Sequence, residues 1–410
     1  MPRPLVFVLL ALMCFQHGKA QVLGFAMDGG KQKVYIPFEL HNNLVVVPVI
    51  LNGRLPLKFI LDTGVRTTIL TDRVFSDILN LRYSRKYTIA GPGGEKLVDA
   101  FVTNNVAIHL PGVTGLGHAM LVLEEDYLEL KNYLGADVHG ILGYELFSRF
   151  IVKIEYDRKV ITLMTPEAFH PRRSFKSMPM KVEDTKPYIN AEAYVSDSVK
   201  IPLKLLVDSG ASHGLVLDPE SDKRIRVPSP SLASVIGRGL GGVITGRIAR
   251  IPQLDIDGFR VMAPTVNYPD LNSYTDTLKA TNVFRNGSLG GEILRRFTVI
   301  YDFPHERIYL RKNGDFKNHF FYNMSGIEVK AKGSTLKEFE VTEVRKGSPA
   351  EEADVRIGDE VVEVNSFASP DLTLNLINSL FNYRPGKRVV MYVKRKDQIL
   401  KKRFLLRSPI

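Results

Sequence analysis

A long internal repeat constrains this chain more than any other feature. Residues 140–150 and residues 287–297 lie 147 positions apart and are identical at six of eleven positions. Two shorter matches lie upstream, at offsets of 146 and 148: Leu61-Asp62-Thr63-Gly64 with Val207-Asp208-Ser209-Gly210, and Gly93-Gly94 with Gly241-Gly242. Three collinear matches at nearly one offset indicate two copies of a whole domain, because the units of solenoid repeats are far shorter.

The two copies set the predicted domain boundaries. We place the first copy at residues 34–164 and the second at 178–311, joined by a linker at 165–177 that contains two prolines and a basic pair. A second polar linker at 312–324 precedes a distinct region at 325–407. A chain of 410 residues is long enough for two or three domains.

Within each copy the pattern is that of short strands and turns. Val, Ile, Thr, Tyr and Phe recur in alternating runs, which is typical of β-structure. Residues 86–89 and 96–108 flank a glycine-rich stretch and predict a hairpin, whereas 144–150 and 291–297 carry apolar residues at helical spacing. The apolar fraction of 44% and charged fraction of 24% are those of soluble globular proteins. We therefore expect a mainly β protein with two similar lobes and a smaller third domain.

Each copy contains an apolar, strand-like run that ends in an aspartate, Asp62 or Asp208. A lone Asp-Thr/Ser-Gly triplet is often a surface turn. However, a carboxylate is costly to bury alone, and two at equivalent positions of a repeat predict a pseudo-twofold axis that brings them together. Two adjacent carboxylates share one proton. The ionised member can then take a proton from water while the protonated one polarises a substrate carbonyl.

The two Asp-Thr/Ser-Gly motifs, the glycine hairpins and the later apolar-apolar-Gly elements resemble those of the pepsin/retropepsin clan of aspartic proteases. The resemblance is closest to bacterial retropepsin-like enzymes with both lobes in one chain, and it covers about residues 34–311. It implies a bilobal fold of two pseudo-symmetric retropepsin-like β-barrel lobes. It also implies that Asp62 and Asp208 form a catalytic dyad that hydrolyses a protein or peptide substrate.

The same resemblance implies supporting roles for neighbouring residues. The dyad loops would be supported by Thr63, Gly64, Ser209 and Gly210. The tips of two flaps that close over substrate would hold Gly93, Gly94, Gly241 and Gly242.

One position departs from the family pattern. The second motif continues with Ala211-Ser212, as the family leads us to expect, whereas the first continues with Val65-Arg66. Three interpretations of Arg66 stay open: it lowers the pKa of a dyad aspartate, it pairs with an acidic substrate group, or it marks a degraded site.

Residues 325–407 resemble a bacterial PDZ domain, through Ser325-Gly326-Ile327, the Gly-Ser-Pro-Ala run at 347–350 and the Ile-Gly-Asp run at 357–359. The resemblance implies a partly open β-barrel with two helices, one of which, at 372–380, lines a peptide groove. PDZ domains bind peptides by strand addition at a sheet edge, and a loop captures the terminal carboxylate. That loop would comprise Met324 and the three residues after it. The alternative is a domain that only buttresses the lobes.

The first twenty residues have the pattern of a secretory signal peptide. Arg3 precedes an apolar run at 5–15, and Gly18-Lys19-Ala20 places small residues before the predicted cut. The run is short for a membrane span, although an N-terminal anchor is the alternative. The chain's single cysteine, Cys14, follows Met13, where a lipoprotein signal has a small residue, so we do not expect lipid attachment there. We expect a periplasmic or extracellular protein with no integral membrane segment after cleavage.

The remaining composition argues against other classes of function. The nine histidines show no metal-binding spacing, and we expect neither a metal nor another cofactor. The net charge of +11 is scattered apart from a basic C-terminal end, so we expect no nucleic-acid partner. The sequence thus predicts an exported aspartic endopeptidase whose PDZ domain binds substrate or partner peptides. The alternative is an inactive protease-like adaptor that acts through that domain.

Overall fold

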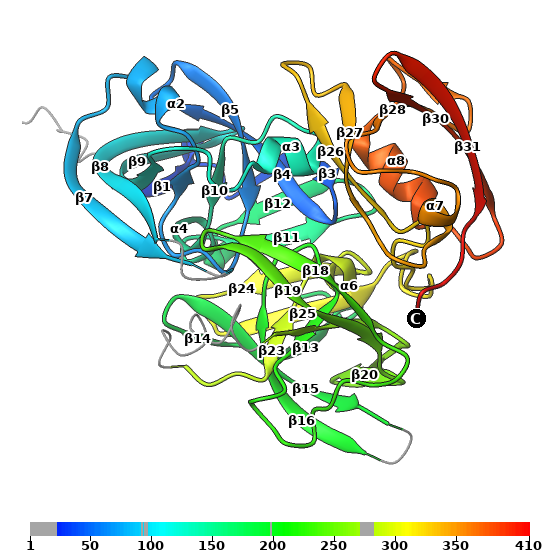
Figure 1. Cartoon of the computed structure of the whole chain (residues 1–410). Helices are drawn as coiled ribbons and strands as arrows, with labels where there is room; N and C mark the ends of the chain where they lie inside the picture. Colours follow the sequence, from blue (N-terminus) through cyan, green and yellow to red (C-terminus); the bar gives the residue numbers. More distant parts are fainter. Residues whose placement is uncertain (1–22, 92, 94–96, 197–198, 271–282) are drawn as a thin grey trace, which may run out of the picture.

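The computed structural model describes residues 23–91, 93, 97–196, 199–270 and 283–410 (Figure 1). The predicted signal segment at 1–20, with Cys14, and the predicted flap residue Gly94 lie outside these ranges. Within them the protein is mainly β, as the sequence predicts. Its strands form two large mixed sheets, one in each half of the repeat, a third sheet between the halves and a separate C-terminal sheet.

The first large sheet comes from the N-terminal half. Its strands are β1 (Gly24–Met27), β3 (Glu39–His41), β4 (Leu44–Leu51), β5 (Leu55–Leu61), β6 (Ile69–Leu70), β7 (Tyr83–Ala90), β8 (Leu97–Leu110), β9 (Val113–Leu123) and β10 (Gly140–Leu142). They are arranged in the order β1-β9-β6-β10-β5-β4-β8-β7, with β3 paired to β4. The connections contain η1 (Asp28–Gly30), α2 (Arg73–Ile78), α3 (Leu130–Leu134) and α4 (Tyr144–Phe147).

The second large sheet comes from the C-terminal half of the repeat. Its strands are β14 (Lys181–Glu183), β15 (Lys186–Tyr194), β16 (Lys200–Val207), β17 (Leu215–Leu217), β18 (Leu232–Gly239), β19 (Gly242–Arg250), β20 (Gln253–Ile256), β21 (Phe259–Met262), β22 (Thr265–Pro269) and β23 (Gly287–Leu289). They follow the order β18-β19-β22-β17-β23-β16-β15-β20-β21, with β14 paired to β15. Helix α6 (Gly291–Leu294) follows β23.

The two halves repeat one strand pattern, which confirms the duplication seen in the sequence. In the first half, β5 pairs in parallel with β10, and β10 pairs antiparallel with β6. In the second half, β16 pairs in parallel with β23, and β23 pairs antiparallel with β17. The short helices predicted after Gly143 and Gly290 are present as α4 and α6.

A six-stranded sheet joins the halves. Its strands are β2 (Lys33–Pro37), β11 (Ile151–Glu155), β12 (Val160–Met164), β13 (Lys176–Pro179), β24 (Phe297–Asp302) and β25 (Arg307–Lys312), and η2 (Pro166–Ala168) lies between β12 and β13. The order is β13-β25-β24-β11-β12-β2, so β11 of one half pairs antiparallel with β24 of the other.

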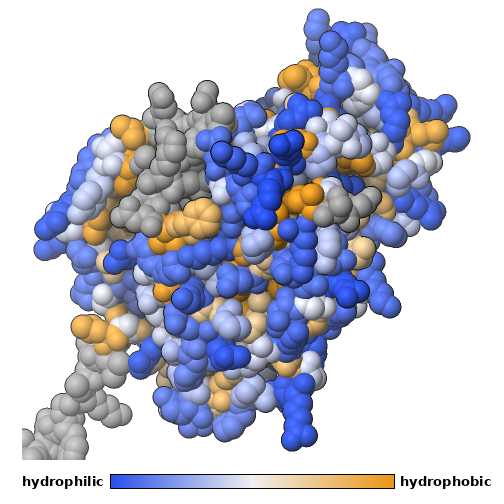
Figure 2. All heavy atoms as spheres, turned by 90° about the horizontal axis from the view of Figure 1, so that it is seen from below, coloured by the Kyte–Doolittle hydropathy of each residue, from blue (hydrophilic) through white to orange (hydrophobic). Residues whose placement is uncertain are grey.

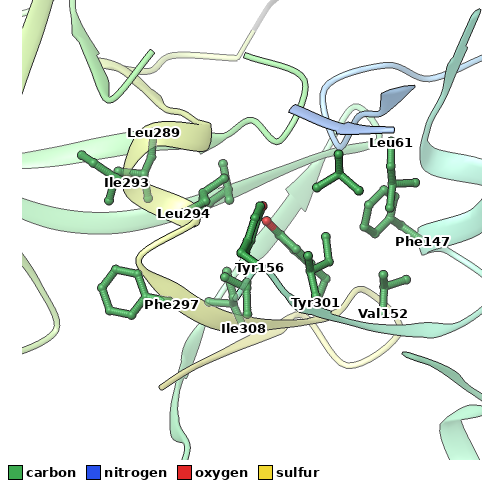
Figure 3. Close-up of a cluster of buried hydrophobic side chains, with 14 of the residues drawn as sticks. Leu61, Phe147, Val152, Tyr156, Leu289, Ile293, Leu294, Phe297, Tyr301 and Ile308 are labelled. Carbon is green, nitrogen blue, oxygen red and sulfur yellow. The ribbon is translucent and has the colours of Figure 1, made fainter. Parts of the chain in front are cut away.

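The side chains above this sheet form part of a core that both halves share. Figure 3 shows Leu61 and Phe147 from the first half close to Tyr301 from the second, with the phenol groups of Tyr156 and Tyr301 directed toward one another. Leu61 directly precedes Asp62, so this common core fixes the base of both aspartate loops. Burying apolar side chains of this size stabilises the fold by about 1.5–3 kcal/mol each.

The C-terminal sheet forms a separate small domain with its own hydrophobic cluster. Its strands are β26 (Ile327–Lys332), β27 (Glu338–Val344), β28 (Glu360–Val364), β29 (Phe367–Ala368), β30 (Arg388–Arg395) and β31 (Gln398–Leu405), in the order β26-β27-β28-β30-β31 with β29 paired to β28. Helix α7 (Pro349–Glu352) has Pro349 in its first turn and Ser348 as its N-cap. Helix α8 (Leu374–Phe381) is capped by Thr373.

The first half of the repeat holds this small domain at two places. Asn132 of α3 donates to the carbonyl oxygen of Ala331 in β26 at 2.9 Å, and Lys330 pairs with Glu129 at 2.6 Å. On α8, the Asn375 side chain donates to the carbonyl oxygen of Leu40 at 3.2 Å. The domain is therefore docked on the first half through both β26 and α8.

The face shown in Figure 2 is mostly hydrophilic, with small and separate hydrophobic patches. Among the residues that the structure describes, no helix combines the length and the apolar character needed to cross a membrane. Nor do the described His, Cys, Asp and Glu side chains gather in groups of three or more that could hold a metal ion.

Candidate active site

The two sequence-predicted aspartates lie together at the boundary between the halves. Asp62 follows β5 and Asp208 follows β16, and their backbone amides donate to the carbonyl oxygens of Leu142 and Leu289, each at 2.9 Å. A methyl group added to Gly64 would lie 3.1 Å from Oδ1 of Asp62 and 3.4 Å from Oδ1 of Asp208. Both carboxyl groups therefore face the same small space.

The hydroxyl groups beside the aspartates bind each loop to the other. Thr63 Oγ1 donates to the carbonyl oxygen of Val207 at 2.6 Å and accepts from the backbone amide of Ser209 at 3.0 Å. In the opposite sense, Ser209 Oγ donates to the carbonyl oxygen of Leu61 at 2.8 Å and accepts from the amide of Thr63 at 3.1 Å. All four bonds are buried, so they hold the two carboxyl groups in register.

The glycines of the loops leave room for the carboxyl groups. The amides of Gly64 and Gly210 donate to Oδ1 of Asp62 and of Asp208, at 2.6 Å and 3.1 Å. A methyl group on Gly210 would overlap the Asp62 carboxyl, with its Cγ only 2.1 Å away. Gly143 and Gly290, from the other part of the repeat, lie similarly close to backbone oxygens of the loops and therefore act as packing residues.

Burial and mutual repulsion control the protonation of the pair. Burial, together with the charge of Asp208, raises the pKa of Asp62. Burial also raises the pKa of Asp208, although the positive charge of Arg285 opposes this shift. A hydrogen bond between the two carboxyl groups contributes in both cases, so the pair shares a proton and titrates as a unit.

Two cations near the pair were missed by the sequence analysis. Lys186 at the start of β15 and Arg285 just before β23 line the same cavity as the aspartates, and the charge of each opposes the rise in a dyad pKa. Burial lowers the pKa of Lys186 itself. Neither residue belongs to a recognisable motif. The available signal was their position in the repeat, because the first copy has apolar residues there.

Arg66, the residue that departs from the family pattern, lies away from the pair. Its side chain is 72% exposed, and Nη1 of its guanidinium lies 4.0 Å from Oδ1 of Asp184. It does not line the cavity that contains the aspartates. The cations that act on the dyad pKa values are Lys186 and Arg285. The other two interpretations of Arg66, a partner for a substrate acid and a sign of a degraded site, stay predictions.

The predicted flaps meet over the site. In the second half, β18 and β19 form a hairpin whose turn holds Leu240 and Gly241, between the paired Gly239 and Gly242. In the first half, Gly93 lies at the tip of the β7–β8 hairpin. A methyl group on Gly93 would fall 2.1 Å from the carbonyl oxygen of Gly242, so the two tips are in direct contact.

A cavity of about 1260 Å³ contains the paired carboxyl groups. Its walls come from both halves of the repeat, from the second flap and from the C-terminal domain, including Val329 of β26 and Ser379 of α8. The aspartate pair and the groove of the C-terminal domain therefore open into one cavity.

His213, which follows the second aspartate loop, has a structural role. Its Nε2 lies 3.0 Å from Ser288 Oγ, and burial lowers its pKa to about 4, so the ring is neutral near neutral pH. Glu292 of α6 accepts from Thr265 Oγ1 at 2.9 Å, and burial raises its pKa. Neither side chain joins the aspartate pair.

The predicted carboxylate loop of the C-terminal domain lies where β26 begins, close to the end of α8. Ser325, Gly326 and Ile327 are buried there. The amide of Met324 donates to the carbonyl oxygen of Phe381, which ties the loop to α8.

Comparison with known families agrees with this geometry. An aspartyl protease family model matches residues 47–146 and 191–293, one segment in each half of the repeat, and each segment contains one of the paired aspartates. A PDZ domain model matches residues 324–403. None of the curated proteins compared with the chain matches it. The chain therefore belongs to the aspartyl protease family, with the family domain in two segments and a PDZ domain on their C-terminal side.

Proposed function

We propose that this protein is an exported aspartic endopeptidase in which Asp62 and Asp208 activate a water molecule. The observation that carries the proposal is the pair of buried carboxyl groups, which the four reciprocal bonds of Thr63 and Ser209 hold together. Family membership supports peptide-bond hydrolysis, and the pattern of residues 1–20 supports export.

The surroundings of the pair favour one assignment of the shared proton. Asp208 is the carboxylate with Arg285 close by, so it takes the ionised form, whereas Asp62 keeps the proton. Asp208 then accepts a proton from the attacking water, and Asp62 donates its proton to the substrate carbonyl oxygen. The resulting tetrahedral diol loses the amine, whose nitrogen takes the proton held by Asp208, while one hydroxyl of the diol returns its proton to Asp62 and the new carboxylic acid is released. No covalent intermediate is formed.

Hydrolysis of a denatured protein, measured from acidic to neutral pH, tests this proposal. We expect Asp62→Asn and Asp208→Asn each to lower kcat/KM by about 10²–10⁴-fold, because each removes one proton-transfer group. Asp397→Asn, an exposed aspartate in the C-terminal domain, is the matched control and should behave as the wild type. An inert wild type, or a dyad variant that cuts at the wild-type rate, would overturn the proposal and favour a non-catalytic peptide-binding protein.

A further inference from the structure

The PDZ groove differs from a groove that captures the end of a chain. Its predicted carboxylate loop is filled from within by Asn323, the residue that precedes it. Asn323 Oδ1 accepts from the backbone amide of Gly326 at 2.9 Å and from Ser325 Oγ at 2.8 Å. Ser325 Oγ in turn accepts from the amide of Ile327 at 3.1 Å. Two of the loop amides that a terminal carboxylate would need therefore already have side-chain acceptors.

The orientation of the Asn323 carboxamide is fixed by its partners. Its Oδ1 faces the amide of Gly326, which only donates, and its Nδ2 donates at 2.8 Å to the carbonyl oxygen of Ile327, which only accepts. Nδ2 also lies 3.0 Å from Glu328 Oε1. The side-chain oxygen thus lies where the loop would otherwise bind one oxygen of a ligand carboxylate.

The charges around the loop also disfavour a terminal carboxylate. Glu328 brings an acidic group to the loop, and Oδ1 of Asn382 is a buried acceptor that has no hydrogen-bond partner among the described residues. An incoming carboxylate would face further acceptors, whereas a peptide N–H could donate to Asn382. The cations that act on Glu328 include Arg345 and Arg238, and Nη2 of Arg345 already donates to the carbonyl oxygen of Asn323 at 3.1 Å.

The middle of β26 remains available for strand addition. The carbonyl oxygen of Ala331 accepts a hydrogen bond from Asn132 of α3. The backbone groups of Ala331 therefore point to the edge of β26 that faces away from β27. Val329, two residues earlier, directs its N–H and C=O to the same edge and lines the cavity. An extended peptide can therefore pair with β26 at Val329.

The groove and the aspartate pair open into one space. The cavity of about 1260 Å³ is lined by Asp62 and Asp208 at one part and by Val329, Asn323 and Ser379 at another. Asn132 of the first half bonds to β26 of the PDZ domain, and Asn375 of the PDZ domain bonds to Leu40 of the first half. These two contacts hold the PDZ domain in this position. A single chain can thus occupy the groove and the catalytic cleft.

We propose that the PDZ groove binds an internal, extended segment of the polypeptide substrate, not its C-terminus, while the same chain continues through the shared cavity to the dyad. This inference rests on the proposed peptidase function for its second half. Its first half, the lack of preference for a free C-terminus, depends only on the groove.

The first test uses the full chain with Asp208→Asn, so that bound peptides are not cut. Two randomised peptide libraries of equal length are compared, one with free C-terminal carboxylates and one with C-terminal amides. We expect both to be retained to a similar degree. Charge-assisted bonds to a captured carboxylate strengthen binding by about tenfold or more. A preference of about tenfold or more for the free acids would therefore overturn the proposal, and so would retention of neither library.

The second test measures wild-type cleavage of a long denatured protein relative to short peptides that span only the cleft. Ser379→Trp fills the groove from α8, and we expect it to lower the ratio of the two kcat/KM values. Ile399→Trp, an exposed position of β31 outside the cavity, is the control and should keep the wild-type ratio. An equal ratio in both variants would overturn the shared-chain half of the proposal. A wild type that cuts nothing would instead contradict the peptidase function, and the library comparison would still decide the C-terminus question.

Discussion

Each half of the candidate active site has an aspartate loop with the same motif, but the residues that form the wall beside the loop differ between the halves. In the first half, Val46 pairs with Ile60, two residues before Asp62. In the second half, Tyr188 pairs with Leu206 at the equivalent point before Asp208. Two residues before Val46 on β4 lies Leu44, and two residues before Tyr188 on β15 lies Lys186. Both begin their strand and pair with the strand just before it in the chain, Leu44 with His41 of β3 and Lys186 with Glu183 of β14.

The same contrast appears on a second strand. His139 and Asn286 both accept a bond from the equivalent backbone amide, that of Lys58 or of Lys204, and so occupy matching places. The preceding residues are Val138 and Arg285. Val138 is buried in an apolar cluster with Leu44, whereas Arg285 acts on Asp208 through its charge.

This comparison explains how a duplicated site can assign different roles to two identical side chains. The four bonds of the interlocked loops are symmetric, so they position the carboxyl groups without distinguishing them. The walls distinguish them: Lys186 acts on both carboxyl groups, whereas the charge of Arg285 acts on Asp208 and favours its ionised form. Divergence of a few wall residues would therefore be enough to give the two aspartates the separate acid and base roles proposed above.

The largest expected effect comes from breaking the symmetric part. Thr63→Val removes a buried donor and a buried acceptor, which leaves a carbonyl oxygen and an amide of the other loop without partners. We expect a loss of about 2–5 kcal/mol in the free energy of unfolding. Activity should fall by roughly 10²-fold in the protein that still folds, because the carboxyl groups shift. Chemical denaturation and peptide cleavage measure the two effects.

Ser209→Ala removes the corresponding bonds of the other half and is the matched variant. Equal losses in both variants would support a symmetric interlock. A loss confined to Thr63→Val would show that the asymmetry of the walls extends into the loops, contrary to the comparison.

Much of this site could be predicted from the sequence because the duplication left local motifs. The paired aspartates, the hydroxyls beside them and the glycine hairpins are each encoded within a few residues, and the repeat offset places them at equivalent points. The wall residues were missed because Lys186 and Arg285 approach the dyad only through strand pairing, which joins positions far apart in the chain. Arg66 was considered as a residue that acts on the dyad pKa for the opposite reason, because a neighbour in sequence was assumed to be a neighbour in space.

The docking of the PDZ domain on the first half could not be predicted from the sequence either. Asn132 and Asn375 are ordinary helix residues, and only the relative position of two separately folded parts makes them contacts between domains. Asn323 was assigned to a linker, and its role appears only when its side chain is seen to bond to the loop that follows.

An intermediate effect is expected from changing the cationic wall. Arg285→Met removes a positive charge near Asp208, so ionisation becomes less favourable and both apparent pKa values of the pair rise. The pH–rate profile should move to higher pH by about one unit, which is near tenfold in rate at a fixed pH on its acidic limb. Arg285→Lys keeps the charge and should retain most of the wild-type profile. A profile shifted to lower pH by Arg285→Met would contradict the assigned role.

The smallest effect, and the most direct test of the asymmetry, is on stability. A carboxyl whose pKa is raised by folding binds its proton more tightly in the folded state. It therefore destabilises the protein as pH rises from the unfolded value of about 3.9 through the raised value. Asp62→Asn leaves Asp208 near both Lys186 and Arg285, whereas Asp208→Asn leaves Asp62 with Lys186 but without the effect of Arg285. At neutral pH we expect Asp62→Asn to be the more stable variant, by about 1 kcal/mol, and the difference should vanish below the unfolded pKa. Thermal unfolding at acidic and neutral pH measures it, and the reverse order would mean that the walls do not set which aspartate carries the proton.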